Sequence, residues 1–226
     1  MCGRARLPED YSEIKIKLAL DDLAPAPNWR GSWNLAPRQD MLTVVRDPAT
    51  GRRVSIKARW GLIPSWAREA KIGDRTFNAR RETIESVASF RGAWRAGQRC
   101  LVVTDGFYEW RKSDRQPFAI ARVNDQLTIL AGLWDLWRAP GGETIRSCTV
   151  ITCPSNDLIA PLHDRMPVVL AEEDWPAWLG ETPATNAALK ELLRPFPSER
   201  MKLWPISKKV NNWRNDGPDL LDPLVA

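Results

Sequence analysis

Histidine is almost absent from this sequence of 226 residues, which contains only His163, and the few cysteines form no CxxC pair. A structural zinc site needs several cysteine or histidine ligands at short spacings, so we expect no metal site. A disulfide framework is equally unexpected in a long chain with so few cysteines. The sequence also lacks a long apolar run and a charged-then-apolar leader, so we expect a cytoplasmic chain with no membrane segment.

Tryptophan and arginine, by contrast, are abundant. The chain carries 12 tryptophans and a formal net charge of +5. Guanidinium groups pair with phosphates, and flat aromatic rings stack on the bases of a single strand. Tryptophans also fill protein cores, and many basic proteins bind no nucleic acid. The composition therefore favours a nucleic-acid partner without establishing one.

The hydrophobic pattern predicts the α+β class, with no internal repeat and no flexible linker. Alternating stretches predict one hairpin of residues 41–46 and 53–60 and a second of residues 118–123 and 127–134. Further strands are expected at 100–104, 145–152 and 167–170, and helices at 8–20, 79–88, 155–160, 172–179 and 186–193. We expect a single domain over residues 1–226, with a mostly antiparallel, barrel-like β-sheet core flanked by short helices and an extended tail at 218–226.

Cys2 directly follows the initiator methionine, which is normally excised when the next side chain is small. Excision would leave an α-amine of pKa ~7.7–8.0 and a thiol of pKa ~8.5 on one residue. An aldehyde forms an imine with such an amine, and the thiol then closes a thiazolidine ring. The same residue could instead attack an amide carbonyl, as in N-terminal nucleophile hydrolases. Cys2 alone does not decide between aldehyde capture and amide hydrolysis.

Three other polar residues stand in distinctive surroundings. His163 lies in a turn between two prolines, where it could move a proton while Arg165 holds a phosphate. Glu109 lies between two large aromatic residues, which would desolvate its carboxylate and raise its pKa toward the range of general acid–base catalysis. Asn78 is expected at a helix start, as a cap, and the neighbouring Arg80 favours contact with a nucleic-acid backbone.

A proline turn follows the strand that ends at Trp60 and carries the aromatic tip Trp66. If it is exposed, such a tip could wedge between bases or stack beside them, and if it is buried it would only anchor the loop.

Seven motifs are spread along the chain. They are Met1-Cys2-Gly3-Arg4 and the segments 33–39, 60–67, 78–83, 105–110, 131–134 and 163–167. Taken together, these motifs resemble those of the SOS response-associated peptidase family.

The resemblance implies a catalytic set of Cys2, Asn78, Glu109 and His163 that needs no cofactor. The implied substrate is the ring-opened sugar of an abasic site in single-stranded DNA, which Cys2 captures reversibly as a thiazolidine. Asn78 would position the amine or the sugar, and Glu109 would relay protons. His163 would assist sugar-ring opening and crosslink reversal, and the imine could also lead to strand cleavage by β-elimination.

The resemblance further implies DNA contacts outside the reacting groups. Arg4, Arg80 and Arg165 would contact phosphates flanking the lesion, and Trp66 would block the duplex path on one side. We expect a monomer acting on abasic sites at replication forks or junctions, associated with the nucleoid in a prokaryote. The only peptide cleavage that the sequence supports is removal of Met1. An amidohydrolase resembling glutamine amidotransferases and a non-catalytic, basic single-strand binding module remain the alternatives.

Overall fold

The structure, a computed structural model, describes residues 2–7, 10–22, 26–28 and 30–224. The strands are β1 (Ala5–Leu7), β2 (Ser32–Leu35), β3 (Asp40–Arg46), β4 (Arg53–Trp60), β5 (Asn78–Arg80), β6 (Arg99–Thr104), β7 (Gly106–Trp110), β8 (Pro117–Arg122), β9 (Thr128–Arg138), β10 (Thr144–Pro154), β11 (Arg165–Pro167) and β12 (Met201–Pro205). The α-helices are α1 (Tyr11–Lys17), α2 (Ala88–Arg95), α3 (Trp175–Leu179) and α4 (Asn186–Glu191). Short 3₁₀ helices are η1 (Ala70–Arg75), η2 (Glu172–Asp174), η3 (Ser198–Arg200), η4 (Lys208–Asn211) and η5 (Pro218–Leu221).

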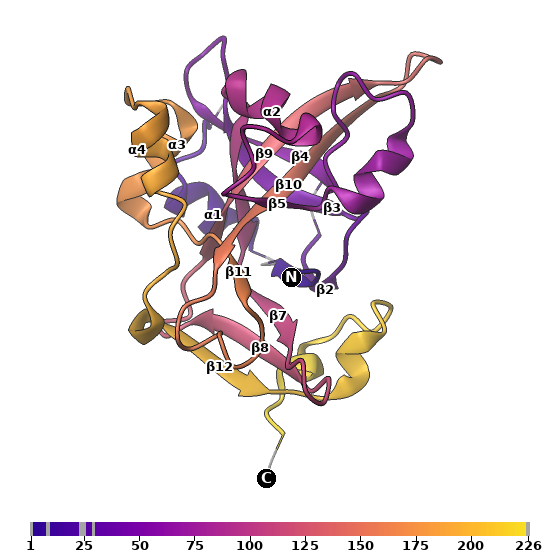
Figure 1. Cartoon of the computed structure of the whole chain (residues 1–226), viewed down its shortest axis with the longest axis vertical. Helices are drawn as coiled ribbons and strands as arrows, with labels where there is room; N and C mark the ends of the chain where they lie inside the picture. The colour runs from indigo at the N-terminus through magenta and orange to yellow at the C-terminus, as the bar shows by residue number, and fades with distance from the viewer. Residues whose placement is uncertain (1, 8–9, 23–25, 29, 225–226) are drawn as a thin grey trace.

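A closed barrel forms the upper part of the molecule in Figure 1. Its strands follow the order β10, β4, β3, β6 and β9, and β9 pairs again with β10. All of these pairings are antiparallel except the short parallel contact between β4 and β10. The predicted hairpin of residues 41–46 and 53–60 is confirmed as β3 and β4. The barrel-like, mostly antiparallel α+β core predicted from the sequence is therefore present.

A second sheet lies below the barrel and has the order β12, β8, β7, β1 and β2. Successive side chains of a strand point to opposite faces, and β7 shows the consequence. Phe107 belongs to the main core, whereas Tyr108 belongs to a small separate cluster with Ala119 and Val210. Glu109 lies two residues after Phe107, so its side chain is on the same face of β7, toward the barrel.

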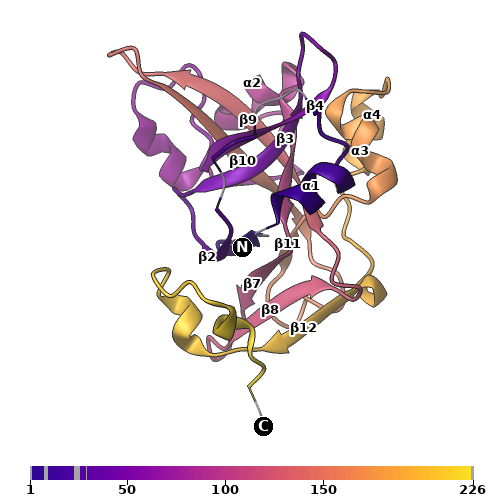
Figure 2. The same cartoon turned by 180° about the vertical axis from the view of Figure 1, so that it is seen from behind.

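Helices cover the barrel from outside (Figures 1 and 2). α1 buries Ile14 because it is amphipathic, and Asp10 caps its first turn by accepting from the N–H groups of Ser12 and Glu13. α3 buries Trp178, whose indole donates to the carbonyl oxygen of Cys100 on the barrel strand β6. Among the described residues, no helix combines the length and the apolar character needed to span a membrane.

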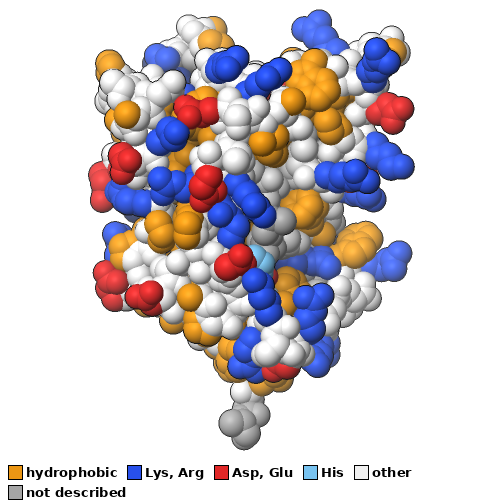
Figure 3. All heavy atoms as spheres, in the orientation of Figure 1, with side chains coloured by type: hydrophobic (Ala, Val, Ile, Leu, Met, Phe, Trp, Pro, Cys, Tyr) orange, Lys and Arg blue, Asp and Glu red, His pale blue; other side chains and the backbone are white. Residues whose placement is uncertain are grey.

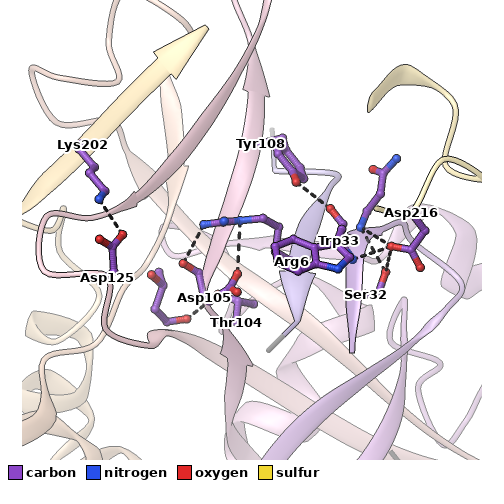
Figure 4. Close-up of polar contacts among 11 residues, drawn as sticks. Arg6, Ser32, Trp33, Thr104, Asp105, Tyr108, Asp125, Lys202 and Asp216 are labelled. Carbon is purple, nitrogen blue, oxygen red and sulfur yellow. Dashed lines mark hydrogen bonds and ion pairs between the residues drawn. The ribbon is translucent and has the colours of Figure 1, made fainter. Parts of the chain in front are cut away.

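Residues 207–216, which we term the C-terminal strap, cross the second sheet and are fastened to β2. The side-chain amide of Asn34 lies 3.1, 3.1 and 2.9 Å from the carbonyl oxygens of Val210, Asn212 and Asn215. In return Asp216 Oδ1 accepts from the backbone N–H groups of β2 at Trp33 and Asn34. Figure 4 shows this junction, with the Tyr108 hydroxyl donating to the carbonyl oxygen of Trp33 at 2.7 Å.

Two predicted elements are wrong because other strand pairings override the local pattern. Residues 118–123 and 127–134 do not form a hairpin, since β8 pairs with β7 and β12 while β9 pairs with β6 and β10. The helix expected over 79–88 is also absent. β5 instead pairs in parallel with β10, and α2 begins only at Ala88.

Smaller differences concern the second half of the chain. Residues 157–162 form hydrogen-bonded turns rather than the helix expected over 155–160. The strand expected at 167–170 is shifted to β11, and Val169 makes only an isolated bridge to Leu130. Residues 218–221 form η5 where an extended tail was expected. The helices predicted over 172–179 and 186–193 are confirmed as η2 with α3, and as α4.

Candidate active site

Cys2 lies three residues before Ala5, the first residue of β1. In Figures 1 and 2 this N-terminal part of the chain runs between the barrel and the second sheet. The pairing of β1 with β7 extends to Arg4, whose carbonyl oxygen accepts from the N–H of Tyr108 at 3.1 Å. The Cys2 side chain is fully buried, and its sulfur lies 3.7 Å from the same Arg4 oxygen. Met1, whose removal the sequence predicts, lies outside the described residues.

Asn78 reaches Cys2 from the barrel. It begins β5, next to Val150 of β10, and its side-chain Nδ2 donates a 2.6 Å hydrogen bond to the Cys2 carbonyl oxygen. Its Oδ1 is buried and has no hydrogen-bond partner among the described residues. A buried amide oxygen without a donor is costly, so Asn78 offers an acceptor to any donor that enters the site.

Glu109 approaches the same region from β7. Its side chain is only 4% exposed, and its Oε1 accepts from the N–H of Trp110 at 3.2 Å. Burial raises the pKa of the Cys2 thiol to about 12, and the negative charge of Glu109 contributes in the same direction. Glu109 is therefore close enough to Cys2 to influence its ionisation.

His163 is presented by the turns that join β10 to β11. Its Nδ1 accepts from the backbone N–H of Arg165 at 3.0 Å and lies 2.9 Å from Asp164 Oδ1. Burial lowers the pKa of His163, while the Glu109 carboxylate acts in the opposite direction. Burial therefore favours the neutral ring, and the hydrogen bond that Nδ1 accepts from Arg165 fits the tautomer with its proton on Nε2.

Glu109 and His163 line a common pocket of about 430 Å³, together with Trp110, Lys112, Arg115 and Asn211. In Figure 3 the single histidine, in pale blue, lies in the hollow at the waist of the molecule, with basic side chains around it. The structure thus brings together all four residues of the expected catalytic set. Asn78 is hydrogen-bonded to Cys2, and the charge of Glu109 raises the pKa of both Cys2 and His163.

Two of the arginines expected to contact DNA are engaged within the protein. Arg4 Nη2 donates to the carbonyl oxygen of Asn211 at 3.1 Å, and its Nη1 is buried without a partner among the described residues. Arg165 forms a two-pronged pair with Glu82, at 3.2 and 3.0 Å, and also donates to Thr152. Its side chain is 12% exposed.

The other two expected DNA contacts are on the surface. Arg80 is exposed at the end of β5, two residues from Asn78. Trp66 is 59% exposed and lines a separate hollow of about 780 Å³, together with the basic residues Arg38, Arg68, Lys71 and Arg75. None of the residues lining this hollow lines the pocket of Glu109 and His163.

Several pocket residues were not singled out from the sequence. Lys112 and Arg115 lie in the turn between β7 and β8, and Asn211 lies in the strap, more than 90 positions further along the chain. Each is a common residue type in a polar stretch, so only the fold shows that they share a pocket. Asn34 stands in one of the quoted motifs, and that motif was the one signal that could have drawn attention to it.

Comparisons with known proteins identify the family of this chain. A family model described as SOS response associated peptidase matches residues 1–213. The chain is 36% identical over 225 residues to abasic site processing protein YoqW of Bacillus subtilis, covering 98% of this chain and 99% of the relative. It is 35% identical to abasic site processing protein HMCES of Xenopus tropicalis, covering 100% of this chain and 79% of the relative. A crystal structure of a Bacteroides thetaiotaomicron protein shares the fold, with a TM-score of 0.85 at 22% identity over 99% of this chain and 100% of that one.

Proposed function

Because the chain belongs to the SOS response associated peptidase family, we propose that it processes abasic sites in DNA, the activity that the names of its relatives state for them. The observation that carries this proposal is the hydrogen bond from Asn78 to Cys2 beside the buried Glu109. It fixes the backbone of a residue that, without Met1, carries an amine and a thiol on adjacent carbons.

The proposed reaction is capture of the open-chain abasic aldehyde by Cys2. The α-amine, with a reference pKa of ~7.7–8.0, attacks the aldehyde carbon, and loss of water gives an imine. The thiol then adds across the carbon–nitrogen double bond, so that sulfur bonds to carbon and nitrogen takes up a proton. Because the Cys2 thiol has a raised pKa, it needs a proton acceptor, and Glu109, whose charge acts on this thiol, would serve as one.

The neutral His163 suits the sugar end of this reaction. Its Nε2–H can donate to the ring oxygen of the closed sugar and favour the open aldehyde, and the same group can assist reversal of the crosslink. Asn78 Oδ1, which has no hydrogen-bond donor among the described residues, would accept from the Cys2 amine or from a sugar hydroxyl. If a base removes a proton from the carbon next to the imine, the 3′ phosphate leaves, and the strand is cleaved by β-elimination.

The proposed DNA partner is a single strand, met at replication forks or junctions by a monomer in the cytoplasm. Arg80 is exposed beside the site, and the buried Nη1 of Arg4 has no hydrogen-bond partner within the described part of the chain. Arg165 would bind a phosphate in place of the Glu82 carboxylate, which is half-exposed. Trp66, which lines a separate hollow, would block the path of a duplex on one side of the lesion.

Incubation with oligonucleotides that carry one abasic site tests the proposal. We expect a heat-stable shifted band with the single-stranded abasic oligonucleotide and none with the same strand intact. A glutaminase assay on the same sample should give no ammonia. Turnover of glutamine without the shifted band would instead establish amide hydrolysis. Salt-dependent binding that is equally strong with and without the abasic site, and no shifted band, would indicate a single-strand binding module.

A further inference from the structure

The turn between β7 and β8 carries basic side chains beside the reacting groups. Lys112 and Arg115 line the pocket of Glu109 and His163, opposite Asn211 of the strap. Arg115 is exposed, and no acidic or other polar partner of its guanidinium lies among the described residues. An unpaired guanidinium at the mouth of a concave site is suited to a phosphate, since it can donate two parallel hydrogen bonds.

Arg115 has an unusual backbone conformation in this turn. Its φ is +60°, a left-handed conformation that is unfavourable for a residue with a side chain. The turn is closed by the hydrogen bonds from Arg115 N to Arg111 O and from Arg111 N to Gln116 O, both of 2.9 Å. Asp114 holds the Arg111 guanidinium at 3.0 and 2.6 Å. Arg111 is thereby occupied, and Arg115 remains available.

Lys112 and Asn211, which line the same pocket as Arg115, can also turn toward an anion. Lys112 Nζ lies 2.8 Å from Asp164 Oδ1, but the two side chains are 59% and 70% exposed, so the pair is weak and exchangeable. Asn211 Oδ1 accepts from the Trp110 indole at 2.8 Å, which leaves its side-chain NH₂ as a donor.

We propose that Arg115, with Lys112 and Asn211, forms a phosphate subsite in this pocket and binds the phosphodiester adjacent to the abasic nucleotide. The proposal rests on the proposed function and adds contacts to those expected at Arg4, Arg80 and Arg165. Among the described residues that line the pocket, Glu109 is the only carboxylate, so Lys112 and Arg115 attract the phosphate while Glu109 serves the sugar. The left-handed backbone of Arg115 is then explained as strain kept for binding.

Arg115→Gln tests the subsite when two aldehydes are compared, an abasic oligonucleotide and free 2-deoxyribose, which has no phosphate. We expect crosslinking of the oligonucleotide at limiting concentration to slow about 10-fold, and its salt dependence, log K against log [salt], to fall by about 0.7. Reaction with 2-deoxyribose should be unchanged. Arg138→Gln is the matched control, because Arg138 is an exposed arginine at the last position of β9 and does not line the pocket, so its replacement should change neither reaction.

Arg115→Gly separates the lost charge from damage to the fold, because glycine adopts a positive φ without strain. It should match Arg115→Gln in binding while its melting temperature is no lower than that of the wild type. A salt slope equal to that of Arg138→Gln, or an equal loss with 2-deoxyribose, would overturn the subsite. Failure of the wild type to react with either aldehyde would instead overturn the proposed function.

Discussion

The side chain of Asn78 holds Cys2 by its backbone, through a 2.6 Å hydrogen bond from Nδ2 to the Cys2 carbonyl oxygen. The bond joins the strand β5 of the barrel to the start of the chain, which itself runs into the second sheet beside β7. A residue near a chain end is thereby fixed without use of its own amine or thiol. Neither nucleophilic group of Cys2 takes part in this hydrogen bond.

Asn78→Ala removes the donor to Cys2 and should slow crosslinking of abasic DNA about 10-fold, the effect of losing a hydrogen bond worth roughly 1.4 kcal/mol. Asn78→Asp should be slower still, because a carboxylate cannot donate and repels the carbonyl oxygen. Single-turnover rates on a gel measure both. Asn186→Ala, at an exposed position of α4, is the control. Unchanged rates in both Asn78 variants would show that the bond has no part in catalysis.

The titration of His163 is open to direct observation, because it is the only histidine in the chain. Burial lowers its pKa and Glu109 opposes that shift, so its NMR midpoint should lie below ~6.5 and fall further in Glu109→Gln. The neutral ring is favoured in the folded state, so its contribution to stability is present above ~6.5 and is lost as the pH falls through the lower, folded-state pKa. A midpoint that rises in Glu109→Gln would contradict the proposed proximity of the two groups.

The Cys2 thiol should react slowly with iodoacetamide at pH 8, because its raised pKa leaves little thiolate. Glu109→Gln removes a negative charge that raises this pKa, so alkylation of Cys2 should become faster. Cys153 provides an internal reference: its pKa is also raised to about 12, chiefly by burial, and Glu109 is not among the causes. Peptide mass spectrometry follows both sites, and equal acceleration at both would indicate general loosening instead.

Asn34→Ala should loosen the C-terminal strap, because it leaves the carbonyl oxygens of Val210, Asn212 and Asn215 without their shared donor. We expect a loss of about 2 kcal/mol in the free energy of unfolding, measured in urea. Because Asn211 lies in the same strap and touches Arg4 and Trp110, binding of abasic DNA should weaken as well. Full stability of this variant would show that the strap is held by other contacts.

The sequence alone predicted the class of the fold and much of its local structure, and the errors have a common physical origin. The pattern of β3 and β4 is completed by a short local turn, so it was found. The strand β5 depends on a partner far along the chain, β10, which no local pattern shows. The strand β8 pairs with its sequence neighbour β7 and with the distant β12, rather than with β9, and the tertiary fold decides between these partners. In α2 the buried Phe90, Ala93 and Trp94 have the spacing of one helix face, so the local sequence does contain a signal for this helix.

The candidate site was predictable as a set of residues but not as a geometry. Cys2, Asn78, Glu109 and His163 were found through motifs, and their roles remain predictions. That Asn78 binds a backbone oxygen, and that it lies in a strand rather than at a helix start, follows only from the pairing of β5 with β10. The pairing of Arg165 with Glu82 likewise depends on the packing of residues far apart in sequence.

Intact-mass measurement of the chain after incubation with a single-stranded abasic oligonucleotide tests the central claim most directly. We predict one species whose mass equals the chain without Met1 plus the oligonucleotide minus one water, with the link mapped to Cys2 and its thiol no longer open to alkylation. Cys2→Ala, and a chain that keeps Met1, should give no such species. A crosslink of full yield in either of these proteins would contradict the account.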